Sequence, residues 1–206
     1  MTLVSEHHEA DTAAKILITA EQLFREIGYQ KTTVADIAKQ LHMSPANIYR
    51  FFDSKKAIHE GVAVRLMSEV EATIADVAAR PGSPTKRLRE VLTAIHRTNV
   101  QLFIGDAKLH EMVMMAMEQN WDACLAHIER LVVIVGEVIA DGIETGEFSA
   151  GDAASAARCT CTAMVRFFHP YVIKECANKP EPSLEQMIDF VLRALGAAQA
   201  GPARAK

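Results

Sequence analysis

The alternation of apolar and polar residues that marks a half-buried β-strand is missing from this sequence of 206 residues, and no segment repeats. Long apolar runs are missing as well. The most apolar run, 131–140, is interrupted by Glu137 and is far shorter than the roughly 20 residues needed to cross a bilayer. The polar start of the chain has no basic region followed by an apolar one, so we expect no signal peptide. These absences favour a helical protein of the cytoplasm.

Cysteine is scarce and is not arranged for metal binding. The four cysteines, Cys124, Cys159, Cys161 and Cys176, include no CxxC pair and match no zinc framework. In a reducing compartment we therefore expect buried free thiols. A redox or metal role for the Cys159–Cys161 pair stays open as the alternative.

Catalytic signatures are missing too. The sequence has no GxSxG, HExxH, P-loop or Rossmann fingerprint, and no strand that would present one. A metal site at His96, His110 and Glu111 has little support, because no two histidines are spaced i, i+4. We expect no enzymatic activity, no cofactor and no metal. The formal charge of −4 does not indicate a nucleic-acid partner for the whole chain, so such a partner must be read from local features.

Helical periodicity dominates what is present. The longest apolar stripe consists of Ile58, Val62, Leu66, Val70, Ile74 and Val77. Gly28 is an expected helix end, and Ser183 forms a capping box with Gln186 before the last helix. The chain is therefore predicted to be all-α, with short and closely spaced helices before about residue 54 and longer helices after it.

The spacing of these helices predicts five segments. Residues 1–11 and 199–206 are expected to be flexible tails. A small N-terminal head of three helices is expected over 12–54, a connecting helix over 55–80, and a larger helical body over 81–198.

The segment 32–58 has the pattern of a helix-turn-helix. Thr33 is a good N-cap with Asp36 at the N3 position, and Ser44 is a second N-cap followed by Pro45 at N1. Two short helices joined by a turn of three or four residues place the second helix in a DNA major groove. The alternative, a generic helical hairpin within a bundle, explains neither the two N-caps nor the polar residues of the second helix.

This motif assigns roles to individual side chains. Pro45, Ala46 and Asn47 lie nearest the base edges, where Asn reads adenine and the other two offer apolar contact. The residues placed to bond phosphates are Thr32, Thr33, Ser44, Tyr49 and Lys55. Aromatic residues form only 6% of the chain, yet three fall within 49–52, which poses the question of core or contact. Seven basic and four acidic residues between Thr12 and Ile58 make this part basic relative to the rest.

Residues 14–62 resemble the DNA-binding domain of the TetR family of bacterial transcriptional regulators. The matching features are the pattern AxxLFxExGYxxTTVxDIA, the turn LHMS, the second helix SPANIYRFF and the start of a long helix at SKKAI. The resemblance implies that Tyr49 and Lys55 contact phosphates, that Arg50 reaches a phosphate, and that Phe52 belongs to the core. Phe51 stands where many members have histidine, and it either makes apolar contact with a sugar or packs beneath the head.

The resemblance also implies a homodimer and a small-molecule inducer. The last two long helices, about 152–176 and 183–197, would pair across a two-fold axis. The expected interface residues are Ala156, Leu184, Met187, Ile188, Val191 and Leu195. The expected ligand-binding residues are His96, Phe103, His110, Met114, Met117, Trp121, Cys159, Met164 and Phe167. Methionines on a helix otherwise serve as core filling, and that alternative stays open.

The resemblance thus implies a cytoplasmic repressor that binds a palindromic operator as a dimer, is released by a small-molecule inducer, and controls an efflux or stress operon. It makes 81–198 the ligand-binding and dimerisation domain. The expected partners are double-stranded operator DNA, the inducer and a second copy of the chain, without a membrane. An activator remains open. The alternative is a helical small-molecule-binding or interaction protein that does not bind DNA.

Overall fold

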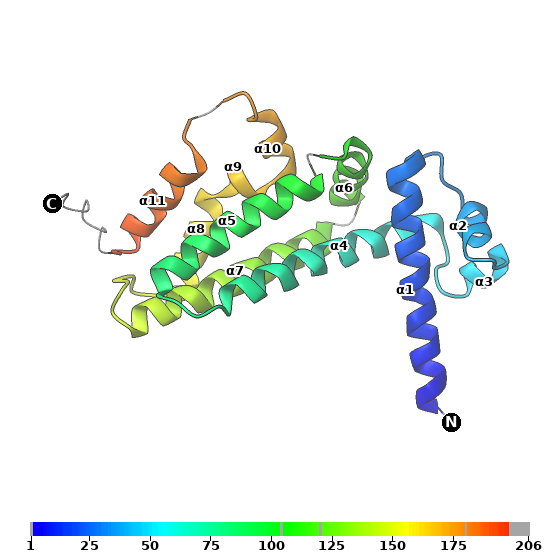
Figure 1. Cartoon of the computed structure of the whole chain (residues 1–206), viewed down its shortest axis with the longest axis horizontal. Coiled ribbons are helices and arrows are strands. Elements are labelled where there is room, and N and C mark those ends of the chain that lie inside the picture. The colour runs from blue at the N-terminus through cyan, green and yellow to red at the C-terminus, as the bar shows by residue number, and fades with distance from the viewer. Residues whose placement is uncertain (1, 104, 120, 180, 198–206) are drawn as a thin grey trace. The chain divides into compact units, whose positions relative to one another are not determined.

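The structure is a computed structural model that describes residues 2–103, 105–119, 121–179 and 181–197. Its helices are α1 (Thr2–Ile27), α2 (Val34–Gln40), α3 (Pro45–Tyr49), α4 (Lys55–Ala78), α5 (Pro84–Phe103), α6 (Ala107–Gln119), α7 (Trp121–Glu144), α8 (Ala153–Ala163), α9 (Val165–Phe168), α10 (Pro170–Glu175) and α11 (Leu184–Ala194). Every regular element in those ranges is a helix, which confirms the all-α prediction (Figure 1). Among these helices, none combines the length and apolar character that a membrane crossing needs.

The helices group into two compact units. The head unit comprises the described residues of Met1–Glu69 and Leu102–Cys124, and the body unit those of Val70–Gln101 and Leu125–Lys206. The first part of α4 therefore belongs to the head unit and its last part to the body unit, while α6 belongs to the head unit. This division differs from the predicted boundaries, which assign residues 81–198 to the body, and the described part of the tail expected over 1–11 belongs to α1.

The head unit has its own apolar core. α2 contacts both α1 and α3 (Figure 1). The buried core side chains from α1 to α4 are Ile16, Ala20, Phe24, Val34, Ile37, Ala38, Ile48, Ile58, Val62 and Leu66. Phe52, which the family resemblance assigns to the core, is partly buried and packs against them. Ala38 is 1% exposed, and its small side chain lets α2 and α3 approach closely.

Helix α6 completes this core. Leu109 and Met112 are fully buried members of it. Asp106 begins the helix by accepting the N–H groups of Lys108 and Leu109, and it pairs with Arg25 of α1 at 3.5 Å. Because α6 contributes both core residues and an ion pair, it is docked on α1 as part of the head unit.

A buried carboxylate joins α1 to α4. Glu21 is 9% exposed and accepts from Arg25 at 2.9 Å and from Arg65 of α4. A carboxylate at such a depth needs donors of this kind, because an unpaired buried charge is strongly destabilising. Gly61 keeps the crossing close, since a Cβ at that position would lie 2.8 Å from Cδ2 of Leu17.

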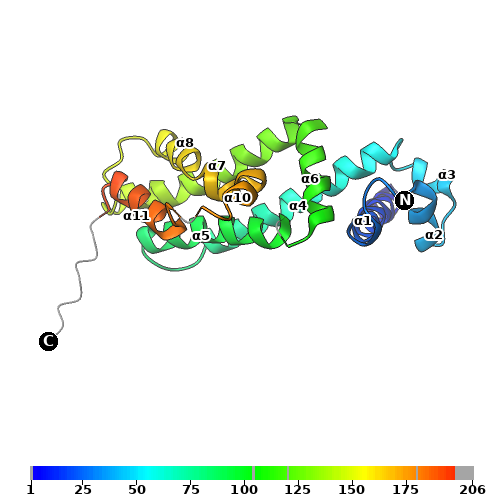
Figure 2. The same cartoon turned by 90° about the horizontal axis from the view of Figure 1, so that it is seen from above.

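The body unit is built on the apolar stripes predicted for its helices. Val70, Ile74 and Val77 of α4 are at most 7% exposed. The buried residues of α5 and α7 include Leu88, Val91, Leu92, Ile95, Val135, Val138 and Ile139. α8 lies beside α7 (Figure 2), where a Cβ at Gly136 would come within 3.5 Å of Ala157.

The helix expected over 152–176 is broken twice. α8 ends at Ala163, and Met164 leads into α9 with ψ at 1°. His169 is extended, with φ −81° and ψ 120°, before Pro170 opens α10. The break at Pro170 follows from the missing proline N–H, which cannot continue the hydrogen bonds of a helix. No proline accounts for the break at Met164.

The last helix begins as the sequence predicts. Ser183 Oγ accepts the Gln186 N–H at 3.2 Å, and the Gln186 side-chain oxygen accepts the Ser183 N–H at 2.7 Å. The predicted capping box is therefore confirmed. Ile188, Val191 and Leu192 of this helix are buried.

Candidate DNA-binding site

Two short, capped helices form the candidate site. In the capping box of α2, Thr33 Oγ1 accepts the Asp36 N–H at 3.1 Å, and Asp36 accepts the Thr33 N–H at 2.8 Å. The hydrogen bonds from Thr33 lower the pKa of Asp36. At the start of α3, Ser44 Oγ accepts the Asn47 N–H at 3.2 Å, and Pro45 occupies the first turn. Both predicted N-caps are confirmed.

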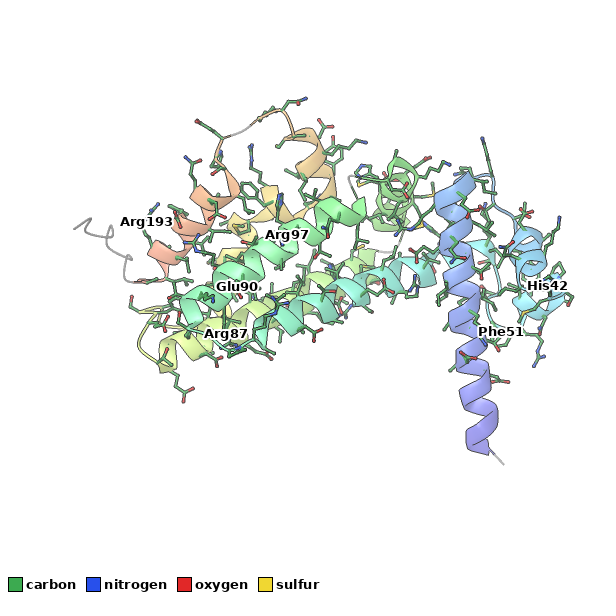
Figure 3. The ribbon with its side chains drawn as sticks, viewed as in Figure 1. His42, Phe51, Arg87, Glu90, Arg97 and Arg193 are labelled. Carbon is green, nitrogen blue, oxygen red and sulfur yellow. The ribbon has the colours of Figure 1, made fainter. Side chains whose placement is uncertain are left out.

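The turn between α2 and α3 depends on one unusual backbone conformation. His42 has φ 54°, in the left-handed region that residues other than glycine seldom adopt. Its side chain is exposed at the edge of the head unit (Figure 3). The Met43 N–H then donates to the Ala38 oxygen at 2.8 Å, which fixes the reversal of the chain.

The outward face of α3 consists of exposed side chains. Pro45, Ala46, Tyr49 and Arg50 are exposed, Tyr49 by 50%, whereas Ile48 is fully buried. A phenol and a guanidinium in succession supply hydrogen-bond donors of the kind that phosphate oxygens accept. The aromatic cluster at 49–52 is thus divided between surface and core.

Thr32, predicted to touch DNA, packs into the head unit instead, and Phe51 follows the second of its two expected alternatives, packing beneath the head. Thr32 is 0% exposed and its hydroxyl donates to the Gly28 oxygen at 2.9 Å. The phosphate contact predicted for Thr32 is wrong, because this hydroxyl is both buried and used. Phe51 is partly buried and packs against the core of the head unit (Figure 3). α3 itself ends at Tyr49, short of the Phe52 expected from the sequence.

The capping hydroxyls of Thr33 and Ser44 differ in whether their proton is free to bond a phosphate. Thr33 Oγ1 donates its proton to Asp36 at 2.6 Å, so the capping box uses it fully. Among the described residues, Ser44 Oγ only accepts a hydrogen bond, and its proton is available to an outside acceptor. Ser44 is therefore the better phosphate donor of the two.

The start of α4 places a lysine beside the turn that follows α1. Ser54 caps the helix by accepting the Ala57 N–H at 3.0 Å, and Lys55 is its first residue. The Lys55 ammonium donates to the Gln30 oxygen at 3.3 Å and lies 4.3 Å from the centroid of the Tyr29 ring. Burial lowers the pKa of Lys55.

The residues predicted to bind a ligand are divided between the two units. In the head unit, His110 is 7% exposed, and Met114 and Met117 are partly buried on α6. The side chains of Phe103 and Trp121 lie outside the described part of the chain. The predicted ligand residues of the body unit are His96, Cys159, Met164 and Phe167.

Three of those body residues have evident structural roles. Met164 and Phe167 are 0% and 8% exposed and belong to the core. His96 Nδ1 lies 2.9 Å from the Phe167 oxygen, and because a carbonyl only accepts, Nδ1 carries the proton. His96 thus satisfies a carbonyl at the break between α9 and α10. Its predicted contact with a ligand stays a prediction.

The two cysteines considered for a redox or metal role have different surroundings. Cys159 is exposed, whereas burial raises the pKa of the Cys161 thiol to about 12 and keeps it protonated. All four cysteines are free. Among the side chains that the structure describes, no three of His, Cys, Asp and Glu gather to hold a metal ion.

Three residues predicted for the dimer interface pack inside the chain itself. Ile188, Val191 and Leu195 are at most 5% exposed and belong to the core of the body unit. The predicted interface is corrected at these positions, because a stripe that faces the core and one that faces a partner look alike in sequence. Ala156, Leu184 and Met187 are only partly buried. Phe190, which the sequence did not single out, is 56% exposed.

A partly buried carboxylate in the body unit also escaped prediction. Glu71 of α4 accepts from Nδ1 of His127 at 2.6 Å and from Arg130, both on α7. Burial raises the pKa of Glu71, but the hydrogen bonds from Arg130 and His127 outweigh it and bring the pKa below its ordinary value. The i, i+3 spacing of His127 and Arg130 was a visible signal, yet nothing in the sequence names the carboxylate that they face.

Comparison with protein families covers both units. The family described as "Bacterial regulatory proteins, tetR family" matches residues 16–62. The family described as "Tetracyclin repressor-like, C-terminal domain" matches residues 84–188, which is more than half of the chain.

Individual relatives agree with these matches. YhgD, an HTH-type transcriptional regulator of Bacillus subtilis (strain 168), is 25% identical over 143 residues, covering 66% of this chain and 71% of YhgD. IcaR of Staphylococcus aureus (strain Newman) is 50% identical over 46 residues, which are 22% of this chain and 25% of IcaR. A TetR/AcrR-family transcriptional regulator from Thermobifida fusca YX-ER1 shares the fold, with a TM-score of 0.57 at 23% identity over 90% of this chain and 96% of that chain. The chain belongs to the TetR family of bacterial transcriptional regulators.

Proposed function

We propose that this regulator is a cytoplasmic repressor that binds a palindromic operator as a homodimer and is released by a small-molecule inducer. The observation that carries the DNA-binding part is the outward face of α3, where Pro45, Ala46, Tyr49 and Arg50 are exposed on a helix capped by Ser44. IcaR, 50% identical over 46 residues, is named a negative regulator of the icaADBC biofilm operon, which favours repression over activation.

The contacts to DNA divide into two kinds. Pro45 and Ala46 offer apolar contact to a thymine methyl group, and Asn47 reads adenine. Phosphates are bound by Ser44, Tyr49, Arg50 and Lys55, which fix the register of the head without reading the sequence. Thr33 supports this surface from within its capping box, since its hydroxyl proton already goes to Asp36.

The proposed dimer uses the outward face of α11. Phe190 is 56% exposed, and Met187 and Ala194, one turn away on either side, share its face. Two copies of this stripe, together with partly buried Ala156 of α8, would meet across a two-fold axis in a self-complementary contact. Such a dimer suits a palindromic operator, whose half-sites lie about 34 Å apart.

The proposed inducer acts through α6. Met114 and Met117 are partly buried on α6, and thioethers adapt to varied apolar ligands. α6 contributes Leu109 and Met112 to the core of the head unit, so a ligand that displaces α6 would disturb the head. We infer an efflux or stress operon as the target, since such operons respond to varied apolar compounds.

The test is fluorescence anisotropy with the DNA upstream of the chain's own coding sequence and a shuffled duplex of the same composition. The upstream DNA is expected to bind about 1,000-fold or more tighter than the shuffled duplex at physiological salt. No binding to either duplex, even at low salt, would instead favour a helical ligand-binding or interaction protein without DNA binding.

Release by the inducer needs its own measurement. A ligand shifts the operator equilibrium only if it binds the DNA-free dimer more tightly than the DNA-bound one. Isothermal titration of a compound found to dissociate the complex is expected to show weaker binding when operator is present. Equal binding to both forms would contradict release.

A further inference from the structure

The turn that follows α1 holds a tyrosine inside the head unit. α1 ends at Ile27, and Gly28 takes φ 91°, a conformation that an L side chain adopts only with strain. The Thr32 N–H and hydroxyl both donate to the Gly28 oxygen, at 3.2 and 2.9 Å, and close the turn. Tyr29 is thereby held partly buried against the core.

The ring of Tyr29 contacts two residues of α4 that lie one turn apart. The Lys55 ammonium is 4.3 Å from its centroid, and the ring centroids of Tyr29 and His59 are 4.5 Å apart. Lys55 also donates to the Gln30 oxygen at 3.3 Å. An ammonium group over an aromatic face is attracted by the ring quadrupole. The ring and the carbonyl together restrict a side chain that would otherwise sample many rotamers.

His59 connects the same ring to α6. His59 is 0% exposed, and its Nε2 lies 2.9 Å from the Met112 oxygen, so Nε2 carries the proton. Nδ1 is buried and has no hydrogen-bond partner among the described residues. Burial lowers the pKa of His59 and outweighs the hydrogen bond to the Met112 oxygen and the charge of Glu60, which both raise it. The imidazole is therefore neutral.

We propose that Tyr29 positions the Lys55 ammonium for a DNA phosphate and that His59 ties this tyrosine to α6, which couples docking of α6 to phosphate binding. This inference rests on the proposed function, in which Lys55 contacts a DNA phosphate. The ammonium has three donors, of which Gln30 takes one and two remain for phosphate oxygens. Displacing α6 would leave the His59 N–H donor buried and unpaired, which is unfavourable. The rings of His59 and Tyr29 would then shift, and the Lys55 ammonium would lose its position.

A double-mutant cycle on operator binding tests the positioning role of Tyr29. Tyr29→Leu is expected to weaken binding about 3- to 10-fold, and Tyr29→Phe, which keeps the ring, to recover most of that loss. In the Lys55→Ala background, Tyr29→Leu is expected to change the dissociation constant by less than about 2-fold. Equal losses in both backgrounds would overturn the positioning role, since Tyr29 would then act only by supporting the fold.

Lys55→Ala by itself tests the phosphate contact. It is expected to reduce the slope of log K against log salt by about 1. An unchanged slope would remove Lys55 from the proposed DNA-binding surface and overturn both its phosphate contact and the positioning role. A reduced slope combined with an additive effect of Tyr29→Leu would overturn the positioning role alone.

His59→Leu tests the link to α6, because it removes the donor to Met112 and keeps an apolar side chain. It is expected to weaken operator binding when Lys55 is present and to have less than about a 2-fold effect in the Lys55→Ala background. His59→Gln, which retains an N–H donor, is expected to recover part of the loss. Equal effects of His59→Leu in both backgrounds would overturn the link.

If circular dichroism shows that Tyr29→Leu does not fold, NMR of the unsubstituted protein tests the positioning role instead. Ring currents of Tyr29 are expected to shift the NMR resonances of the Lys55 side-chain methylene groups upfield. Addition of operator DNA is expected to perturb the same resonances. Methylene resonances at the positions of a free lysine would overturn the positioning role.

Discussion

The imidazole of His96 donates from Nδ1 to the Phe167 oxygen at 2.9 Å, and one turn further along α5 the Asn99 amide donates to the Phe168 oxygen at 2.8 Å. Both carbonyls lie at the end of α9, where Pro170 prevents the helix from continuing. The last carbonyls of a helix have no partner within it. One turn of α5 therefore supplies the hydrogen bonds that a continuous helix would have made.

Asn99→Ala is expected to lower the free energy of unfolding by about 1–3 kcal/mol, because it leaves the partly buried Phe168 carbonyl without its donor. Asn99 is only 4% exposed, so water does not readily replace the amide. Urea denaturation at fixed protein concentration measures the change. Arg97→Ala is the matched control, since Arg97 is exposed on the same helix (Figure 3) and its loss is expected to cost less than about 0.5 kcal/mol. Equal losses would contradict the role of Asn99.

Helical structure over 152–176 could be predicted from the sequence, whereas the break at Met164 could not. Apolar stripes and N-caps are local patterns: Thr33 with Asp36 and Ser183 with Gln186 are each read three residues apart and are both confirmed. Asn99 acts on a carbonyl 69 residues away, and no local pattern specifies such a partner.

The candidate site shows the same limit. The sequence placed Thr32 beside Thr33 as a phosphate ligand, because both hydroxyls stand before the same helix. Only the turn at Gly28 determines that one of them is buried. Tyr29 and His59 were missed for a related reason, since each gains its role from contacts across the fold of the head unit.

Arg50→Ala is expected to weaken binding to all DNA sequences alike and to reduce the slope of log K against log salt by about 1. The reason is that the exposed guanidinium of Arg50, next to Tyr49, is placed to neutralise one phosphate. Arg193→Ala is the control, an exposed arginine of α11 (Figure 3), and is expected to leave the slope unchanged. Anisotropy titrations between low and physiological salt measure both. A loss confined to one operator sequence would instead make Arg50 a base-reading residue.

His42→Asn is expected to stabilise the protein by up to about 1 kcal/mol, because asparagine tolerates the left-handed conformation at φ 54° better than histidine does. The side chain of His42 is exposed, so little packing is lost. His42→Val serves as the opposite control and is expected to destabilise, since β-branched residues are least tolerant of positive φ. Chemical denaturation of the unsubstituted protein and the two variants ranks their free energies of unfolding. Equal stabilities would show that this turn relaxes without cost.

Stability is expected to fall as the pH is lowered from 7 to 5. Burial lowers the pKa of His59, His127 and His169 in the folded chain, whereas in the unfolded chain they protonate near their ordinary pKa of about 6.5. The unfolded state therefore binds more protons below that pH, and each histidine contributes a slope of up to about 1.4 kcal/mol per pH unit. Carboxylates with lowered pKa, such as Asp36, lose their contribution only below about pH 4.

Denaturation of His59→Gln across the same pH range isolates one of these protons. The variant retains an N–H donor for the Met112 oxygen but cannot titrate. The slope of its free energy of unfolding against pH is therefore expected to be smaller by up to about 1.4 kcal/mol per pH unit, the effect of one proton. A slope identical to that of the unsubstituted protein would mean that His59 protonates equally in both states.

Phe190→Glu is expected to weaken the dimer about 30-fold or more, which is the effect of losing a central aromatic contact and placing a charge in an apolar interface. Phe190 is 56% exposed on α11 while Ile188 and Val191 of the same helix are buried, so the substitution spares the core of the body unit. Sedimentation equilibrium measures the dimer, and circular dichroism checks the fold. Val64→Glu, at a residue 40% exposed on the head-unit part of α4, is the control and is expected to leave the dimer intact. If Phe190→Glu left the dimer unaffected, the interface would have to lie on another face of the body unit. The spacing at which the two heads reach a palindromic operator would then differ as well.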